Sequence, residues 1–129
     1  MSLRLTRPEA DELSAVARLR GEKAATLVAR YVTEGVRRSR FPAIEFRDGE
    51  PGRVAYLAGT RWPVWMITQL AEQHGLEFAV KQVRRPMALV RMALAYAKQY
   101  SDEIAACLQL HAERDFEGLK RVLPTLERL

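Results

Sequence analysis

The chain has 129 residues, of which 48% are hydrophobic, and a formal net charge of +5 at pH 7. This length allows one ordinary domain or two very small ones, and no run approaches the roughly 18 apolar residues of a membrane helix. The single cysteine, Cys107, cannot form an internal disulfide, and the N-terminus lacks the apolar stretch of a signal peptide. We therefore expect a cytoplasmic protein without a membrane partner.

The positive charge is concentrated in the first third of the chain. Residues 1–40 contain nine Lys or Arg and five Asp or Glu, a net charge of +4. Residues 41–106 contain eight and seven, and residues 107–129 contain four of each, so these segments carry +1 and zero. A polyanion would therefore bind at the N-terminal end. The alternative is a basic protein whose arginines are only solvated.

The first forty residues predict a short strand followed by two helices. Residues 3–6 alternate apolar and polar side chains, as a strand does. A helix over residues 8–20, capped by Thr6, should end at Gly21, and a second helix should run over about 23–38. The strand has no partner in its own module, and neither helix can bury its apolar stripe alone. The pattern therefore predicts a dimer.

A strand, a helix, a glycine and a helix of these lengths resemble the ribbon-helix-helix family of dimeric repressors over about residues 2–38. The resemblance implies that Leu3 and Leu5 point into a dimer core. It implies that the paired strands enter the major groove of DNA with three side chains, Ser2, Arg4 and Thr6. The start of the second helix would bind a DNA phosphate through its free backbone N–H groups.

The start of the second helix departs from this family, which usually has Ser or Thr there. Here the segment is Gly21-Glu22-Lys23-Ala24-Ala25-Thr26. Lys23 could replace the hydroxyl as a phosphate contact, whereas Glu22 would oppose a phosphate. The module therefore either binds DNA, with Arg37 and Arg38 as further phosphate contacts, or only dimerises.

Residues 41–106 predict a β-hairpin followed by three helices. Two extended runs, at 43–47 and 53–57, are separated by a cluster of turn-forming residues. Three helices are expected after them, over about 64–74, 77–84 and 86–99. This order is the outline of a helix-turn-helix unit with a small sheet.

The same region is similar to Domain-of-Unknown-Function family 433. The matching segments are Pro42-Ala43-Ile44, the turn from Gly49 to Gly52, Leu57 to Val64, Gly75, and Val90 to Tyr96. The resemblance implies a winged helix-turn-helix fold. It also implies an antitoxin role, because members of this family are commonly regarded as antitoxins of small nucleases with a PIN-like fold.

The segment after Gly75 departs from this family, whose members typically start a polar, acidic helix there. Residues 76–80 are more apolar, and a basic turn follows. This segment therefore does not carry the usual base-reading role of the third helix, but Arg84, Arg85 and Arg91 could contact phosphates. The alternative is that Arg84 and Arg85 form a solvated corner.

Gly59-Thr60-Arg61 has two interpretations. Arg61 could bind a phosphate or the carboxylate of a partner. Alternatively, Gly59 allows a turn, Thr60 caps a helix and Arg61 pairs with an acid of its own domain, which is the interpretation we favour. Trp62 and Trp65 are expected as anchors of the core or of an interface.

The C-terminal tail predicts two amphipathic stretches, one from Ser101 and one from Asp115, and Pro124 should bend or end the second. The second stretch has five apolar side chains at helical spacing, Phe116, Leu119, Val122, Leu123 and Leu126. It could fold back on the domain or lie in the groove of a partner. The antitoxin resemblance implies the partner, a toxin whose active site the tail obstructs.

No set of residues is arranged for catalysis. His74 and His111 lie far apart and outside any metal-ligand spacing, and the chain has no phosphate loop or dinucleotide fingerprint. His74 is expected at a helix end and Cys107 in the core. We therefore predict no enzyme, no metal and no cofactor.

These patterns predict a mainly α-helical chain with three parts. Residues 1–40 would form a ribbon-helix-helix module, 41–106 a winged helix-turn-helix-like domain, and 107–129 a toxin-binding tail. The predicted function is a type II antitoxin that neutralises a PIN-like nuclease toxin and represses its own operon at an operator DNA, as a homodimer or a higher assembly. The alternatives are a stand-alone dimeric repressor without a toxin, and an adaptor that dimerises and binds a protein but not DNA.

Overall fold

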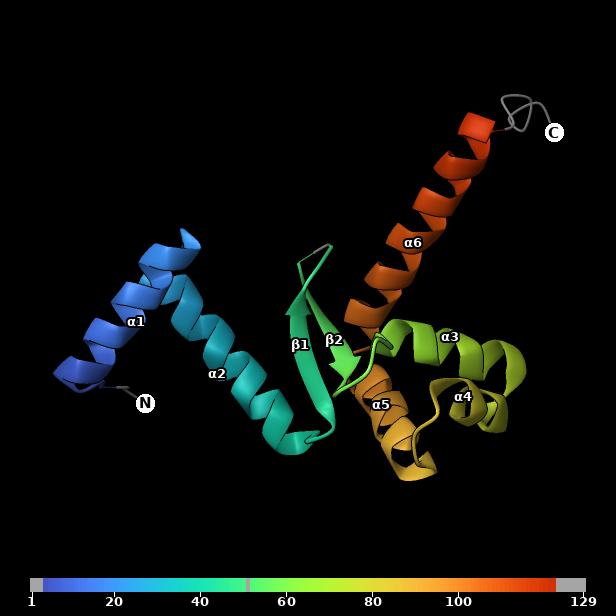
Figure 1. The fold of residues 1–129 in the computed structure, drawn as a ribbon, viewed down its shortest axis with the longest axis horizontal. Coiled ribbons are helices and arrows are strands. Elements are labelled where there is room, and N and C mark those ends of the chain that lie inside the picture. The colour runs from blue at the N-terminus through green and yellow to red at the C-terminus, as the bar shows by residue number, and fades with distance from the viewer. Residues whose placement is uncertain (1–3, 51, 123–129) are drawn as a thin grey trace. The chain divides into compact units, whose positions relative to one another are not determined.

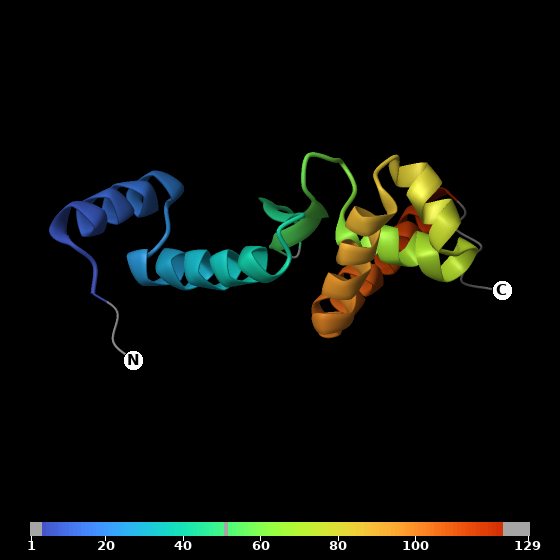
Figure 2. The ribbon, with the colours of Figure 1, turned by 90° about the horizontal axis from the view of Figure 1, so that it is seen from below.

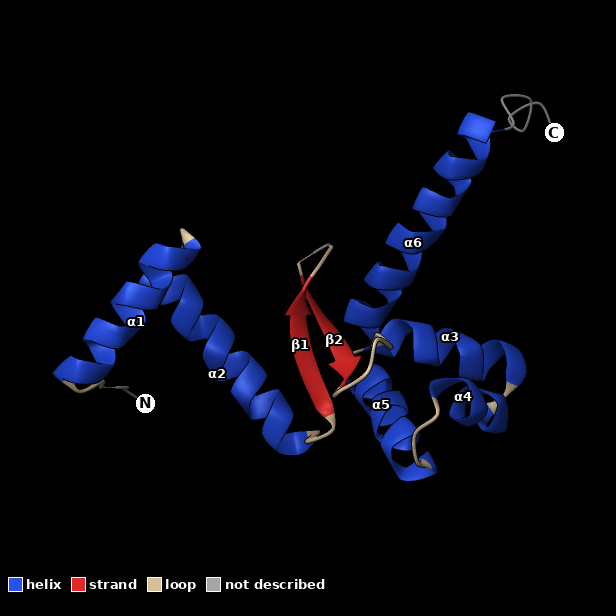
Figure 3. Ribbon diagram, in the orientation of Figure 1, coloured by secondary structure: helices blue, strands red, loops and turns tan. Residues whose placement is uncertain are grey.

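The structure, a computed structural model, describes residues 4–50 and 52–122. It is mainly helical, as predicted, with six helices and one two-stranded antiparallel sheet in these residues (Figures 1 and 3). The chain divides into two compact units, residues 1–40 and 41–129. Among the described helices, none is both long and apolar enough to cross a membrane.

The first unit is a helical hairpin of α1 (Arg7–Arg20) and α2 (Ala24–Arg40), which pack against each other (Figure 2). Both helices begin within one residue of the predicted positions. Residues 4–6, the described part of the predicted strand, are not in a strand, and Leu3 lies outside the described residues. A strand of this kind needs a second chain to supply the hydrogen bonds of its ladder.

Gly21 ends α1 in the left-handed conformation, with φ of 66° and ψ of 31°. Its N–H donates to the carbonyl of Arg18 (3.2 Å), and the N–H of Glu22 donates to the carbonyl of Ala17 (2.9 Å). This pair of bonds is a Schellman motif, which glycine adopts at low steric cost. The glycine therefore stops the first helix where the sequence predicts and turns the chain into α2.

The second unit begins with a β-hairpin. Strands β1 (Ile44–Asp48) and β2 (Arg53–Leu57) pair antiparallel, with Glu45 opposite Tyr56. Four helices follow: α3 (Val64–His74), α4 (Leu76–Val83), α5 (Met87–Gln99) and α6 (Ser101–Val122). The hairpin and the helices α3 to α5 lie close to their predicted ranges, and His74 ends α3 as expected.

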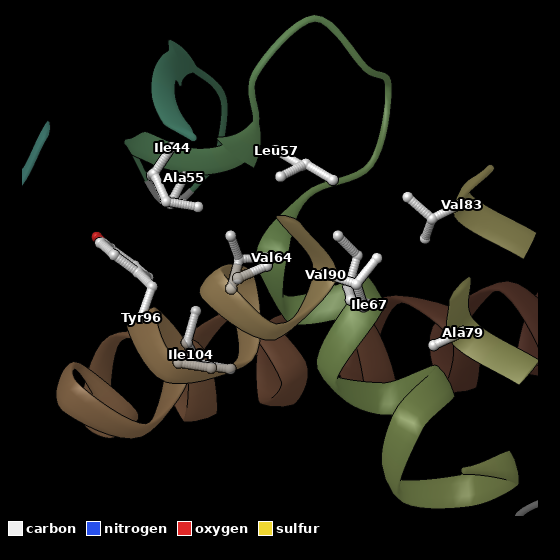
Figure 4. Close-up of a cluster of buried hydrophobic side chains, with 12 residues drawn as sticks. Ile44, Ala55, Leu57, Val64, Ile67, Ala79, Val83, Val90, Tyr96 and Ile104 are labelled. Carbon is white, nitrogen blue, oxygen red and sulfur yellow. The ribbon is translucent and has the colours of Figure 1, made fainter. Parts of the chain in front are cut away.

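One face of the hairpin and all four helices enclose a single apolar core (Figure 4). Its fully buried large side chains are Ile44, Leu57, Val64, Ile67, Val90 and Tyr96. The hydroxyl of Tyr96 donates to Glu103 (2.7 Å), so this polar atom is satisfied within the core. Trp62 and Trp65 are half-buried and pack against the core, as predicted.

The tail differs from its prediction in being one continuous helix from Ser101 to Val122. No break occurs at Asp115, because a residue that suits a first turn does not by itself interrupt a helix. Ile104 and Cys107 are buried against the core, so the expected place of Cys107 is confirmed. Pro124 lies outside the described residues.

Candidate nucleic-acid and partner interfaces

The first unit exposes most of its apolar side chains. Only Ala17 and Leu27 are buried among its described residues. The exposed large apolar side chains are Leu5, Val16, Leu19, Tyr31, Val32 and Val36. Leu19 is 88% exposed and Val36 54%. An apolar surface of this extent on so small a unit is typical of an interface.

Thr6 and Glu9 form a capping box at the start of α1. The Thr6 hydroxyl accepts the Glu9 N–H (3.3 Å) and donates to Glu9 Oε1 (2.6 Å), and the Thr6 N–H donates to the same oxygen (3.1 Å). These bonds with Thr6 lower the pKa of Glu9. The Thr6 hydroxyl is thus already used, whereas Arg4 is exposed. Ser2 lies outside the described residues.

An ion-pair cluster surrounds the turn before α2. Glu22 accepts two hydrogen bonds from Arg30, with one N···O distance of 3.1 Å, and one from Arg20 at 3.2 Å. The pKa of Glu22 is lowered, chiefly by its hydrogen bond with Arg30. Lys23 is exposed beside this cluster, and the first turn of α2 contains no acid. Lys23 is therefore accessible beside Glu22, whose negative charge is balanced by Arg30 and Arg20.

The other predicted phosphate contacts of the first unit lie at the far end of α2. Arg37 and Arg38 are in its last turn, about 21 Å along the helix from Lys23 at 1.5 Å per residue. Arg38 is exposed, while Arg37 is half-buried and has an interaction partner. The structure thus separates the two groups, so one phosphate cannot contact both.

The predicted basic turn of the second unit lies between α4 and α5. Arg84 ends α4 with φ of 58° and is the only described non-glycine residue with positive φ. The guanidinium of Arg85 donates to the carbonyls of Arg84 (3.0 Å) and Gly59 (3.3 Å). Arg91 is exposed in the second turn of α5. Arg85 thus ties this turn to the loop after β2, and all three arginines are exposed.

The loop after β2 is held by a buried threonine. The Thr60 hydroxyl donates to the carbonyl of Leu57 (2.7 Å) and accepts the N–H of Trp62 (3.0 Å). The expectation that Thr60 caps a helix is therefore wrong, because α3 begins only at Val64. Arg61 is exposed and makes no ion pair within the described residues. Its expected pairing with an acid of its own domain is not observed there.

Little of the predicted toxin-binding stripe is described. Phe116 is 48% exposed on α6. Leu119 and Val122 belong to the same helix, but their side chains lie outside the description, as do Leu123 and Leu126 entirely.

Sequence reasoning missed Arg30. It lies eight residues from Glu22, and its long side chain reaches back along α2 to the turn before the helix. The signal available in the sequence was an acid in a turn followed by a basic residue two helical turns later, which is too common to be specific.

Comparison of the chain with protein-family models, with characterised proteins and with solved structures finds no match. Function is therefore inferred from the residues described above.

Proposed function

We propose that the chain is the antitoxin of a type II toxin–antitoxin pair. It neutralises a PIN-like nuclease toxin by direct binding and represses its own operon by binding operator DNA. In this proposal the first unit is a ribbon-helix-helix module and the second is a winged helix-turn-helix-like domain. The observation that supports the proposal most strongly is the number of large apolar side chains that the first unit exposes.

A second copy of the chain is the proposed partner of these side chains. Burial of a large apolar side chain contributes about 1.5–3 kcal/mol, and the first unit exposes Leu5, Val16, Tyr31, Val32 and Val36. Pairing of two N-terminal strands would also satisfy backbone groups of Arg4 and Leu5, which lie outside a sheet in a single chain. Dimerisation would thus complete both the core and the ribbon of the module.

DNA binding is assigned first to Arg4. It is exposed beside the capped start of α1, and a guanidinium can bind a guanine edge through two hydrogen bonds. Thr6 contributes less in this proposal, since its hydroxyl already serves the capping box. Lys23 would bind a phosphate at the start of α2, where Arg30 balances the charge of Glu22.

Further phosphates would be contacted by other exposed arginines. Arg38 could reach a phosphate distant from Lys23 because it lies at the opposite end of α2. In the second unit, Arg84 and Arg91 are exposed and Arg85 fixes the turn that presents Arg84. These contacts would increase the affinity for DNA without adding a preference for a particular sequence. The added affinity would weaken as the salt concentration rises.

Toxin binding is assigned to the outer half of α6 and the residues after it. Phe116 is exposed, and Leu119 and Val122 follow at intervals of three residues on the same helix. This spacing places the three residues along one side of a helix, as in helices that bind an apolar groove. Leu123 and Leu126 would extend the stripe.

The DNA-binding part is tested by Arg4→Ala, measured by gel shift on the DNA upstream of the gene. A base contact is worth about 1–3 kcal/mol, so operator affinity should fall while affinity for unrelated DNA changes less. Arg18→Ala is the matched control, because Arg18 is also exposed but lies near the other end of α1. Equal effects of the two variants would contradict the assignment and favour the adaptor.

The stand-alone repressor is the second candidate. It is favoured by the burial of Ile104 and Cys107, because the first turns of α6 belong to the core of the second unit. In that case the tail would complete the fold and no toxin would bind.

A further inference from the structure

A pocket in the second unit is not used by the proposed function. It has a volume of about 420 Å³, within the range of roughly 300–1,000 Å³ typical of small-molecule sites. The hairpin turn, β2 with the loop after it, the start of α3 and the middle of α6 form its walls. Its apolar side chains include Val54, Pro63, Met66 and Leu110. It therefore combines residues from four separate parts of the unit.

The charges around the pocket leave one cation unmatched. Arg114 pairs with Glu50, the one acid among the described residues that line the pocket. Arg61 also lines the pocket, but it has no ion-pair partner among the described residues. The pocket therefore favours an anionic ligand, and Arg61 is the side chain available to bind it.

The backbone of Arg61 is fixed before any ligand arrives. Thr60, the preceding residue, is buried and bonded to the carbonyl of Leu57, and it accepts the N–H of Trp62, the following residue. The residues on both sides of Arg61 are therefore held by hydrogen bonds of the same hydroxyl. Such preorganisation lowers the entropy cost of binding.

Aromatic side chains line the same pocket. The rings of Trp65 and His111 have centroids 4.7 Å apart, and Tyr56 is held by Arg47, whose guanidinium carbon lies 4.4 Å from the ring centroid. Trp65, His111 and Tyr56 all line the pocket. Aromatic side chains beside a cation suit a ligand that has a flat ring and a negative group.

We propose that this pocket binds a nucleotide, with its base against Trp65 or Tyr56 and its phosphate on Arg61. The nucleotide is either a free nucleoside monophosphate or the end of a single strand. This site goes beyond the antitoxin function and does not depend on it, since operator DNA and the toxin are assigned to other residues.

The proposal is tested by isothermal titration of the full chain with four probes: adenosine monophosphate, adenosine, inorganic phosphate and a single-stranded deoxyadenosine tetranucleotide. The monophosphate should bind at least about tenfold more tightly than adenosine or phosphate, because only it supplies both contacts. Arg61→Gln should weaken its binding by about tenfold or more. Lys81→Gln, which removes an exposed charge from α4 outside the pocket, should leave it unchanged.

The tetranucleotide distinguishes the two sources of the nucleotide. If the tetranucleotide binds more tightly than the monophosphate and Arg61→Gln weakens its binding, the natural ligand is a strand end. If the tetranucleotide binds more weakly than the monophosphate, the natural ligand is a free mononucleotide. The proposal is overturned if the monophosphate does not bind, if phosphate alone binds equally well, or if Arg61→Gln and Lys81→Gln have equal effects. Operator and toxin binding are measured separately, so this failure would leave the antitoxin function untouched.

Discussion

Arg30 on α2 binds the carboxylate of Glu22 in the turn before that helix, with Nη1 3.1 Å from Oε2. The hydrogen bond is the main cause of the lowered pKa of Glu22, and Arg20 adds to it. The negative charge beside Lys23 is therefore matched locally. A phosphate that approaches the start of α2 would meet less repulsion than the sequence alone indicates.

Arg30→Gln should raise the pKa of Glu22 toward its ordinary value of 4.5. Because the pKa of Glu22 is lowered in the folded state, its contact with Arg30 stabilises the fold at pH values above the ordinary pKa. This stabilisation is lost as the pH falls through the lowered pKa. On acidification, Arg30→Gln should therefore lose less of its free energy of unfolding than the unchanged protein does. Carboxyl resonances of Glu22 followed by NMR against pH provide the measurement.

Arg20→Gln is the control for this prediction. Arg20 contributes less than Arg30 to the lowered pKa of Glu22, so its removal should produce the smaller rise. An unchanged pKa in Arg30→Gln, or a larger rise in Arg20→Gln, would show that the pair does not form in solution.

Thr6→Ala should destabilise the first unit by about 1 kcal/mol, because it removes a helix N-cap. The pKa of Glu9 should rise at the same time, since its bonds with Thr6 lower it. Thr6→Ser keeps a hydroxyl and should preserve most of the stability. Urea denaturation of all three proteins at one fixed concentration, followed by circular dichroism, tests this. Equal losses in Ala and Ser variants would mean that the capping box does not stabilise α1.

Gly21→Ala should destabilise the protein by about 1 kcal/mol, because an alanine must then adopt the left-handed conformation. The cost does not come from crowding, since no atom lies within 4 Å of the added Cβ. Gly35→Ala is the matched control, also in open space but inside α2. It should stabilise the helix by roughly 0.5–1 kcal/mol. Thermal denaturation should thus give shifts of opposite sign, and shifts of the same sign would refute the argument.

Thr60→Val should destabilise the second unit by about 1–3 kcal/mol, because valine has nearly the same shape but cannot bond to Leu57 or Trp62. Thr60→Ser retains the hydroxyl and should cost less. The free energy of unfolding in urea measures both. A stable valine variant would mean that water replaces the lost hydrogen bonds in this loop.

Helix ends and the hairpin could be predicted because their signals are local. Gly21, Gly75 and Pro86 interrupt the apolar periodicity where helices end or begin. The tail was predicted less well, since Asp115 has the composition of a first turn but lies inside one long helix. Local composition does not decide whether two amphipathic stretches join.

The sites were harder to predict because they combine residues from distant parts of the chain. The pocket joins Tyr56, Arg61 and Trp65 to His111, about fifty residues later in the chain, and no local pattern reports that contact. Arg30 bonds to Glu22 across eight residues, which is not one of the i, i+3 or i, i+4 spacings that identify a pair on a helix. Thr6 shows the opposite case, since its capping role follows from local spacing and is confirmed.

The antitoxin proposal is tested most directly by co-expression with the product of the adjacent reading frame, followed by pull-down. The full chain is compared with Phe116→Asp and with a chain that ends after Arg114, which keeps the buried turns of α6 and the pair of Arg114 with Glu50. Glu117→Gln serves as the control, because it changes the neighbouring exposed residue. We predict a complex with the full chain and with the control that is lost on truncation and weakened by Phe116→Asp. Absence of any complex with the full chain would contradict the antitoxin function and leave the stand-alone repressor.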